Sequence, residues 1–322
     1  MTDLHVVDAT AEHVDEIVTV IHHAFSNRRT LHPPSTALTE NATTVGAAVA
    51  AYGGLLARID GEPAGAMLFN VAGDVLELRR VSVNPRFQGR GVASAMVGCA
   101  EEAARRRGLG RVRLVARVEL PETLEFWRRR GYSIVAQEGQ NLIHAKAMPI
   151  ELVVPTAEEM RAIAEELAGQ LRAGDVLVLS GDLGAGKTTF TQGLGAGLKV
   201  RGDITSPTFV ISRVHPSLVG GPALVHVDAY RIGGIAELDD LDLDASLEDA
   251  VTVVEWGHGL AETLAPDRLD LTITRGDDDV DETRNLRISP VGARWAASGL
   301  RLTAAHTTDV QAAVTAQRSE GN

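Results

Sequence analysis

The stretch Gly181-Asp-Leu-Gly-Ala-Gly-Lys-Thr188 decides the fold of the second half of this 322-residue chain. The apolar run before it, Val176–Ser180, predicts a buried strand, and the segment after it, Thr188–Leu198, predicts a helix. Glycines let the backbone turn tightly and bring its N–H groups against phosphate oxygens, and the helix N-terminus adds positive potential. Lys187 would neutralise the β- and γ-phosphates, and the Thr188 hydroxyl would hold Mg²⁺. The pattern predicts a nucleoside triphosphate site and disfavours a glycine-rich turn with a chance Lys-Thr pair.

The rest of this half alternates predicted strands with helices, which indicates an α/β fold with a largely parallel sheet. Thr156 and Glu159 form the pattern of a capping box that opens a helix over about 157–171. The further strands are expected at Ala223–Asp228, Val251–Glu255, Leu269–Thr274 and Leu286–Ser289.

Two segments carry candidate residues that would act beside the phosphates. Ser206-Pro-Thr-Phe209 includes Thr208, which could sense the γ-phosphate or simply belong to a loop with an apolar anchor. His226-Val-Asp-Ala-Tyr-Arg231 follows an apolar strand, and a carboxylate there is placed to approach Mg²⁺ or an attacking water. The alternative for Asp228 is a strand-end network in which His226, Tyr230 and Arg231 satisfy one another.

A third segment ends in Glu255-Trp256. Glu255 closes a buried strand, where an unpaired carboxylate is costly and a neighbouring cation removes the cost. Alternatively, the end of this strand is exposed to solvent, and water then solvates the Glu255 carboxylate without any cation. Trp256 could be a core residue or a wall of the nucleotide site. The chain has no guanine-reading Asn-Lys-x-Asp segment, which favours ATP over GTP.

In this order and spacing, the four motifs resemble the TsaE (YjeE-like) family over about residues 151–275. The resemblance implies a P-loop ATPase needed for threonylcarbamoyladenosine at position 37 of tRNA, acting with the proteins TsaB and TsaD. It implies that Lys187 contacts phosphate, that Thr188 and Glu255 hold Mg²⁺, and that Asp228 lies beside the catalytic water, with Thr208 as a further catalytic residue. The expected ATP-binding residues are Gly181, Asp182, Leu183, Gly184, Ala185, Gly186, Lys187, Thr188, Thr189 and Thr156.

In the first half, the informative stretch runs from Leu78 to Ser94, where a strand feeds a loop with spaced glycines and then a helix. The N–H groups of residues 87–91 would point at a pyrophosphate, with Arg86 and Arg90 adding charge. The loop resembles the coenzyme A loop of the GNAT acetyltransferases, and Phe126-Trp-Arg-Arg-Arg-Gly-Tyr132 resembles that family's later helix-to-strand signature. The resemblance implies a mixed sheet flanked by helices over about residues 3–147. It implies that acetyl-CoA contacts Val81, Val83, Arg86, Gln88, Gly89, Arg90, Gly91, Val92 and Ala93.

The catalytic acid of this half departs from the GNAT pattern. Many GNAT enzymes protonate the leaving thiolate with a tyrosine in the helix before the glycine of that signature, and Trp127 stands at the matching position. The upstream asparagine is replaced by Leu120. Glu77 and Glu119 are candidates for amine deprotonation. A domain that binds acetyl-CoA without catalysis, and only tunes the ATPase, is the alternative.

The expected elements of the first half alternate along the chain. The strands are Leu4–Asp8, two strands within 55–69 around an Asp60-Gly61 turn, Leu76–Val83, Arg111–Arg117, Tyr132–Gln137 and Asn141–Ala147. The helices are Ala11–Phe25, Val92–Arg107 and Glu122–Arg130.

Charge and composition suggest two domains in a reducing compartment. Residues 1–148 hold 17 basic and 16 acidic residues, whereas residues 149–322 hold 14 and 27, which leaves the second half with a net charge of −13. Such a half repels a nucleic-acid backbone, so we expect it to reach tRNA only indirectly, through protein partners. The single cysteine, Cys99, and the lack of a signal-peptide pattern or a spanning apolar run favour the cytoplasm and no membrane contact.

These features predict a GNAT domain at residues 1–148, a P-loop ATPase domain at 150–300 and a flexible tail at 301–322. The acetyl acceptor is unknown at this stage. An alternative function is a small-molecule kinase fused to an acetyl-CoA sensor. It predicts an arginine-rich lid, and the second half has few arginines.

Overall fold

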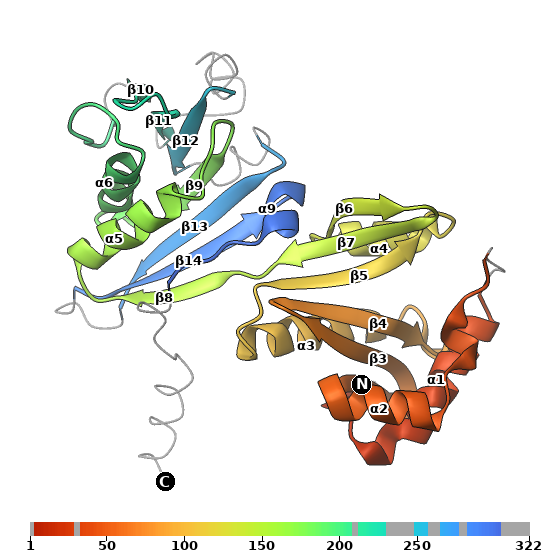
Figure 1. Cartoon of the computed structure of the whole chain (residues 1–322). Helices are drawn as coiled ribbons and strands as arrows, with labels where there is room; N and C mark the ends of the chain where they lie inside the picture. Colours follow the sequence, from red (N-terminus) through yellow and green to blue (C-terminus); the bar gives the residue numbers. More distant parts are fainter. Residues whose placement is uncertain are drawn as a thin grey trace, which may run out of the picture. The chain divides into compact units, whose positions relative to one another are not determined.

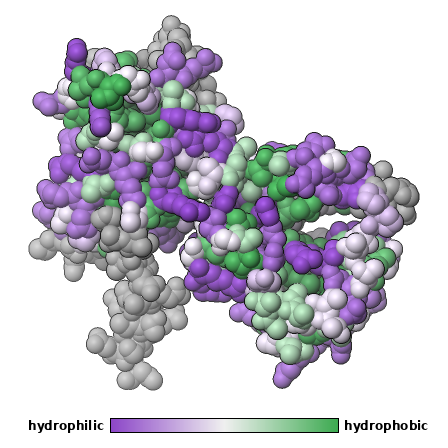
Figure 2. Space-filling view, in the orientation of Figure 1, coloured by the Kyte–Doolittle hydropathy of each residue, from purple (hydrophilic) through white to green (hydrophobic). Residues whose placement is uncertain are grey.

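The structure is a computed structural model of the chain, and it describes residues 3–28, 33–207, 212–229, 248–256, 265–276 and 282–303. The chain forms two compact units, Met1–Met148 and Pro149–Asn322. Each unit is built around its own seven-stranded sheet (Figure 1). On the face drawn in Figure 2, hydrophilic side chains predominate over smaller hydrophobic areas. Within the described part of the chain, no helix has the length and apolar character needed to cross a bilayer.

The sheet of the first unit has the order β1-β2-β3-β4-β5-β7-β6. Only the central pair β4–β5 is parallel. Asp60 and Gly61, both with positive φ, make the predicted turn between β2 and β3. The strands are β1 (Leu4–Asp8), β2 (Gly54–Ile59), β3 (Glu62–Ala72), β4 (Val75–Val83), β5 (Arg111–Arg117), β6 (Ser133–Glu138) and β7 (Asn141–Ala147).

Helices cover both faces of this sheet. On one face, α1 (Val14–Ser26) and α2 (Ala42–Tyr52) share a core with Leu56, Ala66 and Leu68. On the other face, α3 (Val92–Arg106) and α4 (Pro121–Arg128) pack on the remaining strand residues, and Cys99 lies at the edge of that core. Short helices η1 (Ala11–His13), η2 (Thr36–Thr39) and η3 (Pro85–Phe87) join these elements.

The two central strands are paired only where they begin. Val75–Leu78 of β4 pairs with Arg111–Leu114 of β5, and no pairing continues beyond these residues. Farther along β4, Ala66 lies opposite Ser82 and Leu68 opposite Arg79, so two residues of β4 face one of β3. This β-bulge contains Arg80, whose φ of 52° is unusual for a non-glycine residue. Beyond Leu78 and Leu114 the two strands are therefore no longer joined by backbone hydrogen bonds.

The sheet of the second unit has the order β10-β11-β12-β9-β13-β14-β8. Its centre is parallel, but the pairs β10–β11, β13–β14 and β14–β8 are antiparallel, so the sheet is mixed and less parallel than expected. The strands are β8 (Ile150–Val154), β9 (Val176–Ser180), β10 (Ser212–His215), β11 (Ala223–Asp228), β12 (Ala250–Glu255), β13 (Arg268–Arg275) and β14 (Arg284–Val291).

The helices of this unit include α5 (Ala157–Ala168), α6 (Lys187–Gly197) and α9 (Ala293–Ser298). Thr156 caps α5 by accepting a hydrogen bond from the Glu159 amide at 3.2 Å, which is one half of the predicted capping box. The helix ends three residues earlier than expected. Helices α5 and α6 pack closely because Gly193 leaves room for the α5 backbone. A Cβ there would lie 2.3 Å from the Arg161 carbonyl oxygen.

Candidate active sites

The glycine loop of the second unit connects the end of β9 to the start of α6. Gly181 has a φ of 148°, and a Cβ at this position would lie 2.3 Å from the Ile273 carbonyl oxygen. Gly184 and Gly186 also have positive φ, and Gly186 is the N-cap of α6. Only glycine fits this path, which aims the first amides of the helix into the loop. Arg275, which the sequence analysis did not single out, donates to the Leu183 carbonyl at 2.9 Å.

Lys187 is 5% exposed and lies against the loop it follows. Its ammonium donates to the carbonyl oxygens of Gly181 at 2.7 Å and Asp182 at 3.0 Å, and lies 4.0 Å from the ring centre of Trp256. Burial lowers the pKa of Lys187, while the charges of Glu255, Asp228 and Asp182 act in the opposite direction. Trp256 has a φ of 61°, a strained value for a bulky residue, and this places its ring beside the lysine.

Two carboxylates end neighbouring parallel strands beside this loop. Asp228 of β11 is in register with Glu255 of β12, and Glu255 is in register with Leu179 of β9. Both carboxylates are buried, at 5% and 3% exposure. Register alone therefore brings them to the edge of the sheet where the loop begins.

A hydrogen-bond network holds these carboxylates. One oxygen of Glu255, Oε1, lies 2.9 Å from His226 Nε2 and accepts from the Thr188 hydroxyl at 3.3 Å. Asp228 Oδ2 accepts from the Ser206 hydroxyl at 3.2 Å. His226 is fully buried and contacts Glu255. The alternative network with Tyr230 and Arg231 involves residues outside the described ranges.

The donor set suits Mg²⁺. Thr188 and Glu255 offer a hydroxyl and a carboxylate within hydrogen-bonding distance of each other, and Mg²⁺ prefers oxygen ligands, typically one or two carboxylates completed by phosphates and water. No group of three or more His, Cys, Asp or Glu side chains that could hold a metal occurs in the described ranges. The hydroxyl of Thr188 and the carboxylate of Glu255 fit an Mg²⁺ ion whose other ligands would be nucleotide phosphates and water.

Other residues predicted to bind the nucleotide are exposed, make other contacts or lie outside the described part of the chain. Leu183 is 84% exposed at the tip of the loop, and the Thr156 hydroxyl is engaged in capping α5. Thr208, Tyr230 and Arg231 lie outside the described residues, as does most of the predicted tail.

The first unit holds a cavity of about 1050 Å³ where β4 and β5 separate. Gly89 and Gly91 have φ values of 75° and 82°, and Gly91 is the N-cap of α3. Seven predicted acetyl-CoA residues line the cavity: Val81, Val83, Gln88, Gly89, Gly91, Val92 and Ala93. Arg86 and Arg90 do not line it. Arg86 pairs instead with Glu62 at 3.1 Å.

Trp127 lines the same cavity and is 3% exposed. Its ring makes edge contacts with Phe126 and Tyr132, each at 5.0 Å between centroids. The described lining residues include no tyrosine or cysteine that could act as the missing acid. The two candidate bases are engaged in ion pairs, Glu77 with Arg113 and Glu119 with Arg117.

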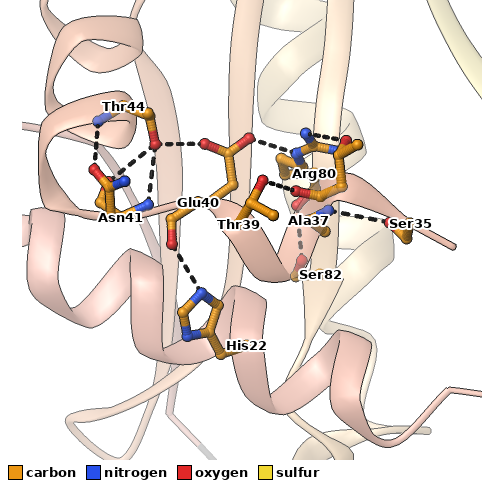
Figure 3. Close-up of polar contacts among 10 residues, drawn as sticks. His22, Ser35, Ala37, Thr39, Glu40, Asn41, Thr44, Arg80 and Ser82 are labelled. Atoms are coloured by element: carbon orange, nitrogen blue, oxygen red, sulfur yellow. Dashed lines mark hydrogen bonds and ion pairs between the residues drawn. The ribbon is translucent and has the colours of Figure 1, made fainter.

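Figure 3 shows the contacts that hold the bulge residue Arg80. Its guanidinium donates to Glu40 at 2.7 Å and to Thr36 at 3.0 Å, and the Thr44 hydroxyl donates to Glu40 at 2.7 Å. Burial acts to raise the pKa of Glu40, but the hydrogen bonds from Thr44 and Arg80 and the charges of Arg80 and Arg79 outweigh it and lower the pKa. The ionised Glu40 thus ties η2 to the bulge.

The strand, glycine loop and helix with two carboxylates define the second unit as a P-loop nucleotide-binding domain, and the opened β4–β5 pair with its loop gives the first unit an acetyltransferase-like architecture. Family models agree: "Threonylcarbamoyl adenosine biosynthesis protein TsaE" matches residues 154–286, and "Acetyltransferase (GNAT) family" matches residues 19–132. The chain belongs to the TsaE family and carries a GNAT acetyltransferase domain before it.

Curated relatives match the second unit. The tRNA threonylcarbamoyladenosine biosynthesis protein TsaE of Streptomyces coelicolor is 58% identical over 147 residues, which is 45% of this chain and 99% of that protein. The protein of the same name from Bacillus subtilis is 42% identical over 139 residues, 43% of this chain and 84% of that protein.

Solved structures match each unit separately. The crystal structure of Bacillus YdiB is 36% identical and covers 46% of this chain and 88% of that one, with a TM-score of 0.38. The PaiA N-acetyltransferase of Thermoplasma acidophilum, solved with coenzyme A, is 13% identical and covers 45% and 99%, with a TM-score of 0.42.

Proposed function

We propose that the second unit hydrolyses ATP in threonylcarbamoyladenosine formation on tRNA, together with TsaB and TsaD. The observation that carries this proposal is the convergence of Lys187, Thr188, Asp228 and Glu255 beside one glycine loop. Lys187 would turn from the loop carbonyls to the phosphates, and Asp228 would orient the attacking water. Mg²⁺ held by Thr188 and Glu255 would neutralise charge on the phosphate oxygens.

The partners of this unit follow from its charge. With a net charge of −13, residues 149–322 repel the tRNA backbone, so contact with the pathway runs through proteins. TsaB and TsaD are the partners implied by the family.

The decisive variant is Lys187→Ala. We expect it to abolish ATP binding and to remove the threonylcarbamoyl group from tRNA in cells that depend on this chain, measured by mass spectrometry. Lys199→Ala is the matched control, because Lys199 is an exposed lysine just after α6. Modification that persists in the Lys187 variant would contradict the assignment.

A second assay separates hydrolysis from kinase chemistry. Phosphate release by the purified chain should rise when TsaB and TsaD are added. A phosphorylated small molecule in place of free phosphate would instead indicate a kinase.

We further propose that the first unit transfers acetyl groups from acetyl-CoA to an amine. The amine nitrogen would bond to the acetyl carbon as the carbon–sulfur bond breaks; the amine loses a proton and the thiolate gains one. Because Trp127 has no acidic proton, the thiolate would take its proton from water. Mass-spectrometric detection of an acetylated amine from a panel tests this step, and tight acetyl-CoA binding without any product would indicate a sensor.

A further inference from the structure

Residues from both faces of the sheet line the cavity of the first unit, and one of these faces is rich in arginine. Val112, Leu114 and Ala116 of β5 pack in the core with α3. The alternating residues Arg113 and Arg117 must point to the opposite face, where α1 lies. By the same alternation, Leu76 and Leu78 of β4 face α3, whereas Glu77 and Arg79 face α1. Arg80 lies on the same side, because it donates to Glu40 and Thr36 in the segment between α1 and α2, and so does Arg28, which follows α1. The cavity residues on the α1 side therefore include Arg28, Arg79, Arg80, Arg113 and Arg117.

Three of these five arginines are neutralised by carboxylates. Arg80 pairs with Glu40 at 2.7 Å, Arg113 pairs with Glu77, and Arg117 pairs with Glu119 at 2.7 Å. Each carboxylate is thereby committed to one guanidinium.

The remaining two, Arg28 and Arg79, have no ion-pair partner among the residues that the structure describes, although the charge of Arg79 reaches Glu40. Both are exposed and line the cavity. The only carboxylates lining the described cavity are Glu77, already paired, and Glu122 of α4. The α1 side of the cavity therefore holds an excess of positive charge.

Arg28 is held close to the expected reaction centre. Its guanidinium donates to the Val81 carbonyl at 3.0 Å and stacks 4.0 Å from the ring centre of Phe25. Val81 lies on the strand where acetyl-CoA is expected. The glycine loop, by contrast, precedes α3 and belongs to the other face of the sheet. The cofactor would thus enter from the α3 face and the acceptor amine from the α1 face.

We propose that the acceptor is an amine that carries an anionic group, bound by Arg28 and Arg79. This inference rests on the acetyltransferase function proposed above and names its substrate class. Guanidinium groups recognise carboxylate and phosphate through charge-assisted hydrogen bonds, so either anion satisfies the site. Cationic acceptors such as polyamines would meet uncompensated like charge, which disfavours their binding.

The test uses the full chain, acetyl-CoA and four amines of similar length: γ-aminobutyrate, aminopropylphosphonate, butylamine and putrescine. We expect kcat/KM for one or both anionic amines to exceed that of butylamine by tenfold or more, the effect of about one charged hydrogen bond. Putrescine should be the poorest acceptor. The first two amines distinguish carboxylate from phosphate as the preferred anion.

Variants of the two arginines test where the anionic group of the amine binds. Arg28→Gln and Arg79→Gln should each raise the KM for the anionic amine about tenfold and leave the KM for acetyl-CoA unchanged. Arg106→Gln is the matched control, since Arg106 is an arginine at the end of α3 that does not line the cavity. Circular dichroism and melting temperature verify that each variant is folded.

Binding of the amines to the chain loaded with coenzyme A, measured by calorimetry, separates the two proposals. Anionic amines that bind through Arg28 but are never acetylated would support the site and contradict catalysis. Transfer that favours butylamine or putrescine would overturn the inference while leaving the acetyltransferase function intact. Absence of both binding and transfer for the anionic amines would also overturn it.

Discussion

The buried contact between His226 and Glu255 can be tested in two independent ways, by the stability of the second unit and by its affinity for ATP. His226→Leu removes the Nε2 donor, 2.9 Å from Oε1, with little change in volume. A hydrogen bond to a charged group contributes about 1.5–3 kcal/mol, and Glu255 is only 3% exposed, so water cannot replace the donor. We expect the free energy of unfolding of the second unit to fall by about that amount.

Because the chain has two units, its unfolding need not be two-state. The loss of stability must therefore be measured in the second unit itself. Hydrogen exchange of the β11 and β12 amides in urea reports on the strands concerned. A double-mutant cycle with Glu255→Gln should give a coupling energy of about 1 kcal/mol or more.

The same substitution should weaken Mg²⁺-dependent ATP binding by about tenfold to a hundredfold, since the partner that orients Glu255, the proposed Mg²⁺ ligand, is lost. His215→Leu is the matched control, because His215 is buried in the neighbouring strand but contacts the Arg201 carbonyl rather than Glu255. Unchanged ATP affinity, together with a coupling energy below about 0.5 kcal/mol, would refute the reasoning.

Three further predictions concern single positions. Gly181→Ala should abolish ATP binding and destabilise the second unit by about 1–3 kcal/mol or more, measured by calorimetry, whereas Gly202→Ala, whose Cβ meets nothing within 4 Å, should retain ATP binding. Trp127→Tyr should raise kcat for acetyl transfer about tenfold or more by supplying a phenol, and an unchanged kcat in a folded variant would show that the proton is not limiting. Burial lowers the pKa of His144, so its pKa in the folded state lies below the unfolded-state value near 6.5. Above pH 6.5 the residue leaves the free energy of unfolding unchanged. As the solution is acidified below that pH, the unfolded state binds the proton more readily, and the free energy of unfolding falls by at most about 1.4 kcal/mol per pH unit. His144→Phe should flatten the stability profile of the first unit below pH 6.5, as measured by urea unfolding.

Local sequence predicted the glycine loop between β9 and α6 and the two strands beside it, because the geometry of each is set within a short segment. The path of residues 181–188 needs glycine at particular dihedral angles, and the strand before it is a plain apolar run. Asp228 and Glu255 end adjacent parallel strands in register, so the pairing of these strands alone brings the two carboxylates together.

Features that depend on distant segments were missed. Neither α2 nor β8 was predicted. The residues of α2 are rich in alanine and follow the Asn41 cap, and β8 is stabilised by pairing with the distant β14. The antiparallel edges of the second sheet likewise depend on partners far along the chain. The arginines on the α1 side come from the segment just after α1, from β4 and from β5, and no motif joins residues 28, 79 and 117.

The short strand β8 has a practical consequence for anyone who separates the two activities. Only two residues, Met148 and Pro149, lie between β7 and β8, and the TsaE family match starts at residue 154, the last residue of β8. A chain cut at that point would lose the partner of β14 and leave the backbone groups of that strand open to pairing with other molecules. Insolubility of such a fragment would then reflect the position of the cut and not a dependence of the ATPase on the acetyltransferase.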